Sequence, residues 1–287
     1  MGLVILFWLT LLVFWQLPDS RLRVVFCDVG QGDAVLVTWK NYQMLVDGGP
    51  DNSVLSCLGK NMAFWDREIE LVMLTHPQAD HMTGLIEVLE RYEVGQLVAA
   101  NVMNETPEYW QLRKVVLEKG VKVRELVEGD ELRVGPVELA VLWPRERGGE
   151  PLAWKKAGER QVLGAGTYKG DVNEMSLVLK GSFGQFDFLL TGDVGEKEEL
   201  ELVNQRRLSE VELLKVAHHG SRYSSSQVFL RQVSPEVAVV SVGGRNRFGH
   251  PTEAVLDRLV EVGAKVVRTD EKGMVRIVSD GESWWQD

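Results

Sequence analysis

All five histidines of this chain lie in three tight clusters, and each cluster follows a run of residues that favours a β-strand. The runs end near residues 75, 216 and 242, and the histidines that follow them are His76 and His81, then His218 and His219, then His250. Histidines scattered over a surface would rarely give this distribution. Because active sites on open sheets gather at strand ends, the pattern predicts one site built from several strand ends.

The rest of the chain alternates β-rich runs with segments of helical spacing. Strands are expected at two runs within 22–39, and at 42–47, 70–75, 122–126, 131–134, 137–143, 176–180, 186–191, 211–216, 237–242, 265–268 and 274–279. Helices are expected at 84–92, 106–119, 196–206, after Ser224 and at 252–262, and a long exposed loop at 145–170. This order predicts a layered α/β protein in which two similar halves bury two sheets face to face.

The charge and composition limit the function classes. The 287 residues have ordinary globular proportions, which exclude a disordered chain and a polytopic membrane protein. The net charge of -10 argues against a protein that coats nucleic acid through bulk charge. Any contact with nucleic acid must therefore be local, and the candidates for a basic patch are Arg222, Arg245, Arg247, Lys155, Lys156 and Lys169.

Cys27 and Cys57 are the two cysteines of the chain. Two cysteines cannot form a disulfide framework. A single bond between them is one alternative, and we expect two reduced thiols.

Residues 1–17 form an apolar segment that only Thr10 and Gln16 interrupt. The segment has the shortest length that can span a membrane, and it lacks the basic start and the cleavage site of a signal peptide. We therefore divide the chain into a hydrophobic membrane segment at 1–20, an anchor or a remnant of a channel helix, and a hydrolase domain at 21–287. A buried or propeptide-like segment is the alternative. Arg21 and Arg23 would put the domain in the cytoplasm by the positive-inside rule.

Four polar clusters carry potential metal chemistry. The first is Thr75 to His81, in which His76, Asp80 and His81 supply imidazole and carboxylate groups that suit Zn, Mn or Fe. Asp80 alone could instead cap the next helix. The other clusters are Gly192-Asp193, Lys215 to Ser221 and Arg247 to Pro251, and Gly-Asp by itself is common in any protein.

These motifs, in their order along the chain, resemble those of the metallo-β-lactamase fold. The matching segments are Asp47-Gly48-Gly49, His76-x-Gln78-x-Asp80-His81, Gly192-Asp193 and His218-His219-Gly220-Ser221. The segment Asp28 to Ala34 and Gly249-His250-Pro251 resemble the C-terminal domain of ComEC-type DNA-uptake (competence) proteins. The resemblance covers residue 22 to the end and implies an α/β fold, a four-layer αββα sandwich.

The resemblance also implies a ligand set for divalent metal ions. One metal ion would take Asp80, His81, Asp193 and His218, and a second would take His76 and Gln78 with Asp193 as a bridge. A metal-activated water would attack phosphorus. Asp80, His219 and His250 are the implied catalytic residues, with His219 orienting the site and His250 contacting the phosphate or protonating the leaving oxygen.

The sequence departs from the family pattern at the second metal. Gln78 replaces a histidine, and no histidine lies between residues 82 and 217, so Asn173 or Asp171 falls where a mid-chain ligand is expected. Oxygen-rich ligation shifts preference from Zn toward Mn or Mg. We therefore expect one firm site and one weaker site for Mn or Zn, with activity that depends on added Mn.

Five further polar residues are candidates for substrate binding: Gln31, Asp33, Asp47, Asn173 and Ser221. For Gln31 and Asp33, a role in the site and a tight strand connection, in which Asp33 bonds its own backbone, are equally good interpretations.

The sequence thus predicts a metal-dependent phosphodiesterase or nuclease that acts on single-stranded DNA during DNA uptake. The expected partners are DNA, a membrane through residues 1–17, and a separate membrane channel subunit. The hydrolase domain is expected outside the cytoplasmic membrane. The alternatives are a metallo-hydrolase of another phosphodiester or small ester, such as a phosphocholine ester, and a non-catalytic DNA-binding scaffold, because fold alone does not fix the substrate.

Overall fold

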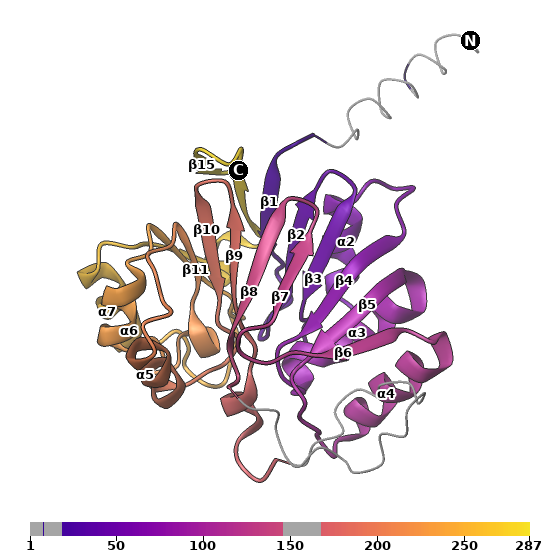
Figure 1. The fold of residues 1–287 in the computed structure, drawn as a ribbon, viewed down its shortest axis with the longest axis horizontal. Helices are drawn as coiled ribbons and strands as arrows, with labels where there is room; N and C mark the ends of the chain where they lie inside the picture. Colours follow the sequence, from indigo (N-terminus) through magenta and orange to yellow (C-terminus); the bar gives the residue numbers. More distant parts are fainter. Residues whose placement is uncertain (1–7, 9–18, 146–167) are drawn as a thin grey trace.

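The computed structural model describes residues 8, 19–145 and 168–287, which form two β-sheets between two layers of helices (Figure 1). The first sheet runs in the order β15 (Trp284–Gln286), β14 (Val275–Ser279), β1 (Leu22–Phe26), β2 (Val35–Trp39), β3 (Tyr42–Val46), β4 (Glu68–Leu74), β5 (Glu93–Ala99), β6 (Lys122–Glu125). The second runs β13 (Lys265–Arg268), β12 (Val237–Val240), β11 (Leu213–Lys215), β10 (Phe186–Leu190), β9 (Val178–Phe183), β8 (Val137–Trp143), β7 (Glu131–Val134).

Helices cover the outer face of each sheet. The first sheet carries α2 (Val54–Asn61), α3 (Ala79–Arg91) and α4 (Pro107–Lys119). The second carries α5 (Glu196–Asn204), α6 (Gln227–Val233) and α7 (Glu253–Glu261), and α8 (Thr269–Lys272) follows β13. The four-layer αββα sandwich is therefore confirmed.

Three apolar cores separate the four layers, because strand side chains alternate between two covered faces. In β4, Met73 packs between the two sheets with Phe186 and Phe188, whereas Val72 faces the helix side. On the other side of the molecule, Leu189 of β10 packs in the core beneath α5 to α7. Both sheets are thus buried on both faces, which explains the continuous apolar runs of their central strands.

Several elements differ from the sequence expectation. Helix α3 begins at Ala79, inside the first histidine cluster, because the extended backbone of Gln78 ends there and Asp80 sits in the first turn. Strand β5 was not expected, since Gly95 interrupts its pattern. In the structure a side chain at Gly95 would approach the carbonyl oxygen of Glu70 to 2.7 Å, so glycine permits close pairing with β4. Helix α2 and strand β15 were also missed.

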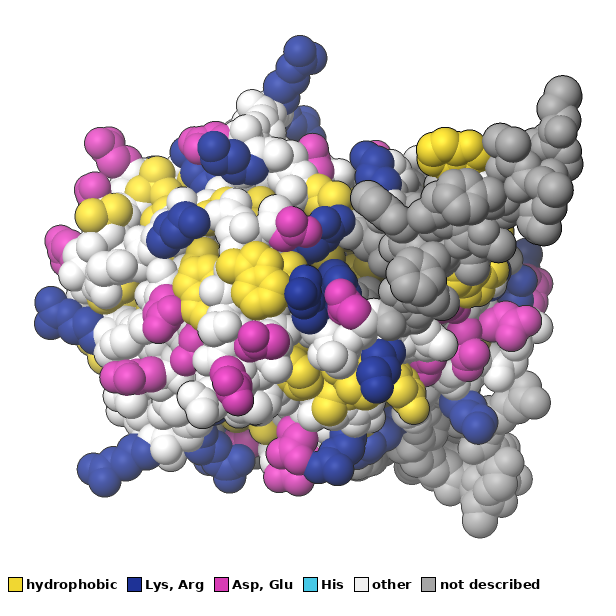
Figure 2. All heavy atoms as spheres, turned by 90° about the horizontal axis from the view of Figure 1, so that it is seen from above, with side chains coloured by type: hydrophobic (Ala, Val, Ile, Leu, Met, Phe, Trp, Pro, Cys, Tyr) yellow, Lys and Arg dark blue, Asp and Glu magenta, His cyan; other side chains and the backbone are white. Residues whose placement is uncertain are grey.

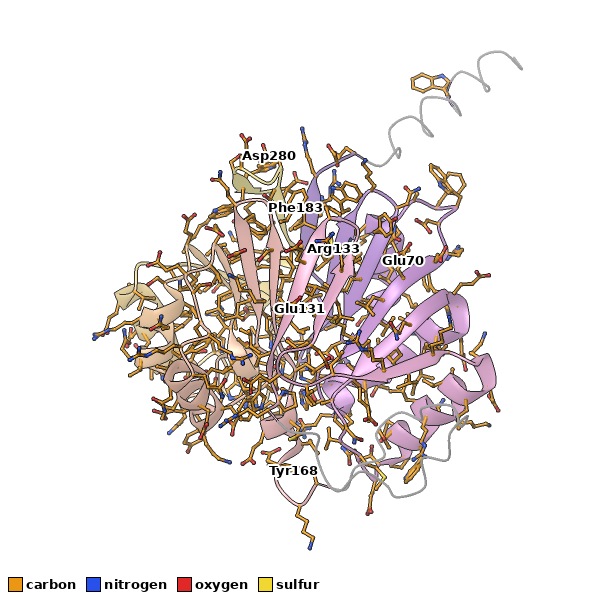
Figure 3. The ribbon with its side chains drawn as sticks, viewed as in Figure 1. Glu70, Glu131, Arg133, Tyr168, Phe183 and Asp280 are labelled. Atoms are coloured by element: carbon orange, nitrogen blue, oxygen red, sulfur yellow. A yellow bond between two sulfur atoms is a disulfide. The ribbon has the colours of Figure 1, made fainter. Side chains whose placement is uncertain are left out.

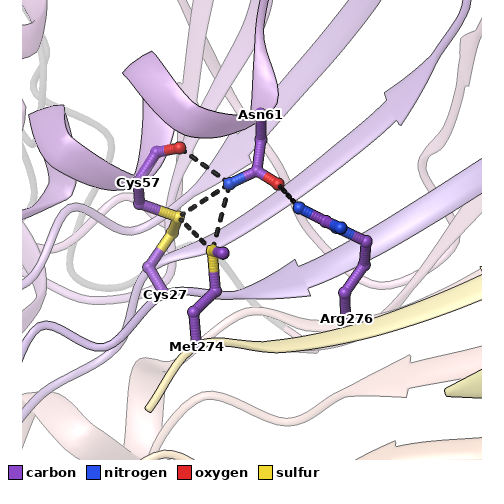
Figure 4. Close-up of a disulfide and its surroundings, with 5 residues drawn as sticks. All are labelled: Cys27, Cys57, Asn61, Met274 and Arg276. Carbon is purple, nitrogen blue, oxygen red and sulfur yellow. Dashed lines mark hydrogen bonds between the residues drawn. A yellow bond between two sulfur atoms is a disulfide. The ribbon is translucent and has the colours of Figure 1, made fainter. Parts of the chain in front are cut away.

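Cys27 and Cys57 form a disulfide, so the expectation of two reduced thiols was wrong (Figure 4). The sequence could not show that α2 brings Cys57 to the end of β1. Asn61 donates hydrogen bonds to the carbonyl oxygen of Cys57 (2.7 Å) and to the sulfur of Met274 (3.1 Å), and Arg276 donates to Asn61 (2.6 Å). The disulfide therefore ties β1 to α2, and the hydrogen bond from Arg276 to Asn61 ties α2 to β14.

Removing this disulfide should destabilise the protein. A Cys27→Ser/Cys57→Ser variant frees a loop of 30 residues, and loop-closure entropy gives an expected loss of about 3–4 kcal/mol in unfolding free energy. Denaturant unfolding of the oxidised protein, the reduced protein and the variant measures it. Equal stability of the oxidised and reduced forms would contradict the bond's structural role.

No helix among residues 19–145 and 168–287 is long and apolar enough to cross a bilayer. The expected segment at 1–17 lies, except for Trp8, outside the described residues, as does most of the expected loop at 145–170 and with it Lys155 and Lys156. The division at residue 20 stays a prediction.

Candidate metal centre

The polar clusters meet at one edge of the sandwich. Phe183 ends β9 at the upper edge in Figure 3, and β10 runs antiparallel to β9 and parallel to β11 and β12. The carboxyl ends of β10, β11 and β12 therefore lie at the lower edge, where Asp193 and His219 follow. Figure 2 views the molecule from the upper end, where basic and acidic side chains are mixed and no described histidine is visible.

The backbone that presents the two adjacent histidines is unusual. His218 and His219 have φ of 50° and 54°, and Gly220 follows with φ of 82°. Two successive non-glycine residues in the left-handed region cost free energy that the surrounding structure must offset. Such conformations cluster at functional sites, and this one lets the two rings point in different directions.

Three histidines have one ring nitrogen engaged and the other unpartnered. Nδ1 of His76 lies 3.1 Å from Thr75 Oγ1, Nδ1 of His81 lies 2.8 Å from Asp47 Oδ2, and Nδ1 of His219 lies 2.9 Å from the carbonyl oxygen of Ser241. Their three Nε2 atoms are buried and have no hydrogen-bond partner. This is how proteins orient metal-binding imidazoles, since an oxygen on one nitrogen fixes the tautomer that exposes the other.

Carboxylates converge on the same free nitrogens. Asp193 Oδ2 lies 3.3 Å from Nε2 of His81 and 3.3 Å from Nε2 of His219, and Asp80 Oδ2 lies 3.5 Å from the latter. Sets of three ligand atoms fall within 4.8 Å of one another in four combinations: His76, His81 and Asp193; Asp80, His81 and His219; Asp33, Asp193 and His219; and Asp33, Asp47 and His81.

A buried lysine lies beside this cluster. Lys215 of β11 is 2% exposed, forms a close ion pair with Asp33, donates to the carbonyl oxygen of Gly192 (2.9 Å) and lies 3.5 Å from Asp193 Oδ1. Burial opposes its charge, but Asp33 and Asp193 outweigh that effect and raise the pKa of Lys215. Lys215 therefore neutralises part of the negative charge that the site concentrates.

The protonation preferences of the three histidines diverge. Burial and the neighbouring His81 lower the pKa of His76 to about 3. Burial also disfavours charge on His81 and His219, but the adjacent carboxylates, Asp193 foremost, raise the pKa of both well above the ordinary value. The carboxylates thus favour protonated, positively charged forms of these two imidazoles. A metal cation bound between the same groups would balance the negative charge in place of those protons.

The donor set fits a divalent metal ion. Unpartnered buried polar atoms are rare in proteins and call for an explanation, and here His76, His81 and His219 each aim one such nitrogen at Asp193 or its neighbours. Imidazole nitrogens mixed with carboxylate oxygens suit Zn, Mn or Fe. No other polar partner for these nitrogens occurs among the described residues.

His218 and His219 are placed differently from the sequence prediction. His219 is 2% exposed and belongs to two of the four ligand sets. His218 belongs to none of them, its side chain is 32% exposed, and its Nε2 lies 3.8 Å from Asp193 Oδ2. The ring of His250 lies 5.9 Å from that of His218, so these two rings border the site.

Two of the predicted substrate-binding residues, Asp47 and Ser221, are buried and contact other residues of the protein. Asp47 is fully buried and accepts hydrogen bonds from Thr75 N (2.8 Å) and Thr75 Oγ1 (2.7 Å) besides contacting His81. Ser221 is 5% exposed and its hydroxyl accepts a long bond from Tyr223 N (3.4 Å). The geometry gives Asp47 the position of a residue that orients His81.

Two further predicted substrate-binding residues, Gln31 and Asp33, lie in the turn before β2. Asp33 faces the site, with its backbone N–H donating to Asp80 O (3.1 Å). A side chain at Gly32, where φ is 141°, would meet that carbonyl oxygen at 2.2 Å, so only glycine allows this approach. Gln31 accepts a bond from Gly243 N (3.3 Å) and joins the turn to the loop after β12.

The residues expected to supply oxygen ligands to the second metal ion are Asn173 or Asp171 and Gln78, and their environments differ. Asn173 is 9% exposed in the short helix η1 (Val172–Met175), and its Oδ1 is buried and unpartnered. Asp171 instead caps η1 by accepting from Asn173 N (3.0 Å). Gln78 is half-buried at the start of α3.

Sequence reasoning missed Lys215 as a member of the site. The signal was its position, because this lysine ends the short apolar strand β11 three residues before His218. A fully buried lysine needs a paired acid, and Asp33 was already a candidate.

Comparison with known proteins gives the relatives. The profile of the Metallo-beta-lactamase superfamily matches residues 27–245. ComE operon protein 3 of Bacillus subtilis (strain 168) is 28% identical over 93% of this chain and 34% of its own length. Competence protein ComA of Neisseria gonorrhoeae is 31% identical over 90% of this chain and 32% of its own length. The chain thus spans about a third of these relatives.

Among solved structures, the metallo-beta-lactamase fold protein YhfI from Bacillus subtilis resembles the chain with a TM-score of 0.56 and 12% identity. The match covers 94% of this chain and 100% of that protein. At this identity the likeness concerns the fold.

Proposed function

Because the chain belongs to the metallo-beta-lactamase superfamily, whose members are mostly metal-dependent hydrolases, we propose that it is a metal-dependent phosphodiesterase that cleaves DNA. The observation that carries the proposal is the convergence of three unpartnered Nε2 atoms on Asp193 and Asp80. A bound divalent ion in such a site lowers the pKa of water and stabilises developing negative charge.

We assign the principal metal to Asp80, His81, Asp193 and His219, so that His219 replaces the His218 predicted from the sequence. The distances of 3.3 to 3.5 Å between Nε2 of His219 and the two carboxylates favour this exchange. A second, weaker ion would use His76 and Asp193, with Asn173 and Gln78 as candidate oxygen ligands. The oxygen-rich set supports a preference for Mn over Zn.

His218 and His250 act on the substrate from the rim. Burial and the nearby His218 and His219 rings lower the pKa of His250, and its Nδ1 has no partner. The neutral imidazole that results suits a hydrogen bond to a phosphate oxygen better than protonation of the leaving oxygen. His218, whose side chain is 32% exposed, is then free to contact the same phosphate group.

The names of the relatives support DNA as the substrate. One of them is called a competence protein and another a ComE operon protein, and these names agree with the resemblance of the sequence motifs to DNA-uptake proteins. The Cys27–Cys57 bond supports a location outside the cytoplasmic membrane, because disulfides persist in oxidising compartments. Residues 1–17 as a membrane anchor and a separate channel subunit complete the proposal.

Two other functions are tested in the same assay. The protein, stripped of metal and reloaded with Mn, Mg or Zn, is offered single- and double-stranded DNA, bis-p-nitrophenyl phosphate, a phosphocholine ester and a carboxylate ester. We expect DNA and bis-p-nitrophenyl phosphate to be cleaved, best with Mn. Cleavage of the phosphocholine or carboxylate ester alone would favour the small-ester hydrolase, and DNA binding without cleavage would favour the scaffold. Full activity with two tightly held Zn ions would contradict the metal assignment.

Metal binding should release protons. In the metal-free protein the raised pKa values of His81 and His219 keep both rings charged near neutral pH, and ligands must be neutral. Below those pKa values the metal affinity should therefore rise with pH, by about tenfold per pH unit for each proton displaced. Calorimetry in buffers of different ionisation enthalpy counts the protons.

Matched variants identify which histidines release them. His219→Gln should release about one proton fewer than the wild type. His76→Gln should leave the count unchanged, because the low pKa of His76 already keeps it neutral. Proton-free binding by the wild-type protein would show that these imidazoles are not ligands.

A further inference from the structure

A continuous row of aromatic rings leads from the buried ligands to the surface. Ring centroids are 5.5 Å apart for His81 and His219, 6.2 Å for His219 and His218, and 5.9 Å for His218 and His250. The row ends at Phe248, whose ring stacks on His250 at 5.8 Å with an interplanar angle of 26°. Phe248 is 64% exposed, so one face of its ring is covered by His250 and much of the remainder meets water.

The loop that carries Phe248 is held in place. Asn246 donates from its side-chain amide to the carbonyl oxygens of Gly243 and His250, both at 2.8 Å, and accepts from His250 N at 3.0 Å. Gly243 in turn donates to Gln31, in the turn that positions Asp33. The ring is therefore presented from a fixed loop tied to the metal centre, and a ligand that stacks on it meets a preorganised surface.

The charges around Phe248 suit an anionic chain. Arg245 and Arg247 precede it in the same loop, both are exposed, and neither forms an ion pair with another residue of the described part of the chain. In a protein of net charge -10 this is a local site of positive charge. An aromatic face beside free arginines is the combination that binds single-stranded nucleic acid, with stacking for the base and charge for the backbone.

We propose that Phe248 is a stacking platform for a nucleobase of single-stranded DNA, next to the scissile phosphate. The inference rests on the proposed phosphodiesterase function and names a specificity contact for it. Any base has a π face, so the platform favours unpaired bases without selecting a sequence. A base paired within a duplex cannot offer that face, so the contact distinguishes single-stranded from double-stranded DNA.

The test compares a base-bearing strand with a base-free strand of the same charge. Binding of a short labelled oligothymidylate and of a matched abasic strand is measured by fluorescence anisotropy, with a chelator present to prevent cleavage. We expect the wild-type protein to prefer oligothymidylate, and Phe248→Ala to weaken that binding by about 5- to 150-fold while leaving the abasic strand unchanged. Phe248→Leu should behave like Phe248→Ala, and Phe248→Trp should retain binding.

Phe64→Ala is the matched control. Phe64 is 66% exposed, about as much as Phe248, but it precedes β4, at the end of that strand opposite His76. We expect Phe64→Ala to bind oligothymidylate and the abasic DNA strand as the wild-type protein does. Equal binding of the two strands by the wild type, no binding of either, or full retention in Phe248→Leu would each overturn the proposal.

Failure of this contact is distinguishable from failure of the proposed function. Cleavage of bis-p-nitrophenyl phosphate and DNA with unchanged binding in Phe248→Ala would reject the platform and keep the phosphodiesterase. A base-dependent loss of binding in a protein that cleaves no phosphodiester with any metal would keep the platform and reject the enzyme.

Discussion

Asp193→Asn is expected to abolish hydrolysis, with kcat/KM falling by about 10³-fold or more, because a metal ion supplies several kcal/mol of transition-state stabilisation. Asp193 is the carboxylate that lies 3.3 Å from Nε2 of both His81 and His219. Asparagine keeps its size and can still accept from Lys215, so the fold should persist. Steady-state kinetics on bis-p-nitrophenyl phosphate and metal analysis of the purified variant measure the two effects.

Asp187→Asn is the control, taken from the strand that precedes Asp193. Asp187 lies in β10 and pairs at the sheet surface with Lys180 (2.6 Å), away from the histidines. Its activity and metal content should equal those of the wild type. If Asp193→Asn kept its metal and its Mn-dependent nuclease activity, the whole site assignment would be wrong.

Lys215→Met should cause the largest loss of stability. The substitution removes the closest cation of the buried Asp33, and breaking a buried ion pair in this way costs about 3–5 kcal/mol. Denaturant unfolding of the metal-free protein measures the loss. Asp33→Asn in the same chain should recover much of it, because the uncompensated charge is then removed. Added metal should stabilise Lys215→Met more than the wild type, since the metal ion neutralises the buried negative charge that the lysine no longer balances.

Lys180→Met is the control variant for the loss of stability expected in Lys215→Met. Lys180 also pairs with an aspartate, but its side chain is 21% exposed. Partly exposed pairs contribute about 0–1 kcal/mol, so this variant should lose little. Equal losses of unfolding free energy in Lys215→Met and Lys180→Met would mean that the buried Lys215–Asp33 pair stabilises the protein no more than a partly exposed pair does.

The fold could be predicted from the sequence because its signals are local. The apolar runs before His76, Asp193 and His218 marked buried strands, and the motif order along the chain marked the four-layer sandwich. Strand β5 was missed because Gly95 looks like a turn residue, and its reason for being glycine, a close approach to Glu70, lies in another strand.

The sequence predicted where the site lies better than it predicted the role of each residue in it. That His76, Asp80, His81 and Asp193 converge followed from their strand ends. Which of His218 and His219 faces the carboxylates depends on two left-handed backbone conformations that no local pattern encodes. The disulfide and the Lys215–Asp33 pair join residues 30 or more positions apart, so they too depended on the three-dimensional structure.

The most direct measurement of the central claim is single-stranded DNA cleavage by the metal-free protein during stepwise addition of Mn. We predict no cleavage without metal, onset as the first equivalent of Mn binds, and loss of cleavage with weakened Mn binding in His219→Gln. Cleavage that persists in the presence of a chelator, or Mn binding without cleavage of any phosphodiester, would contradict the account.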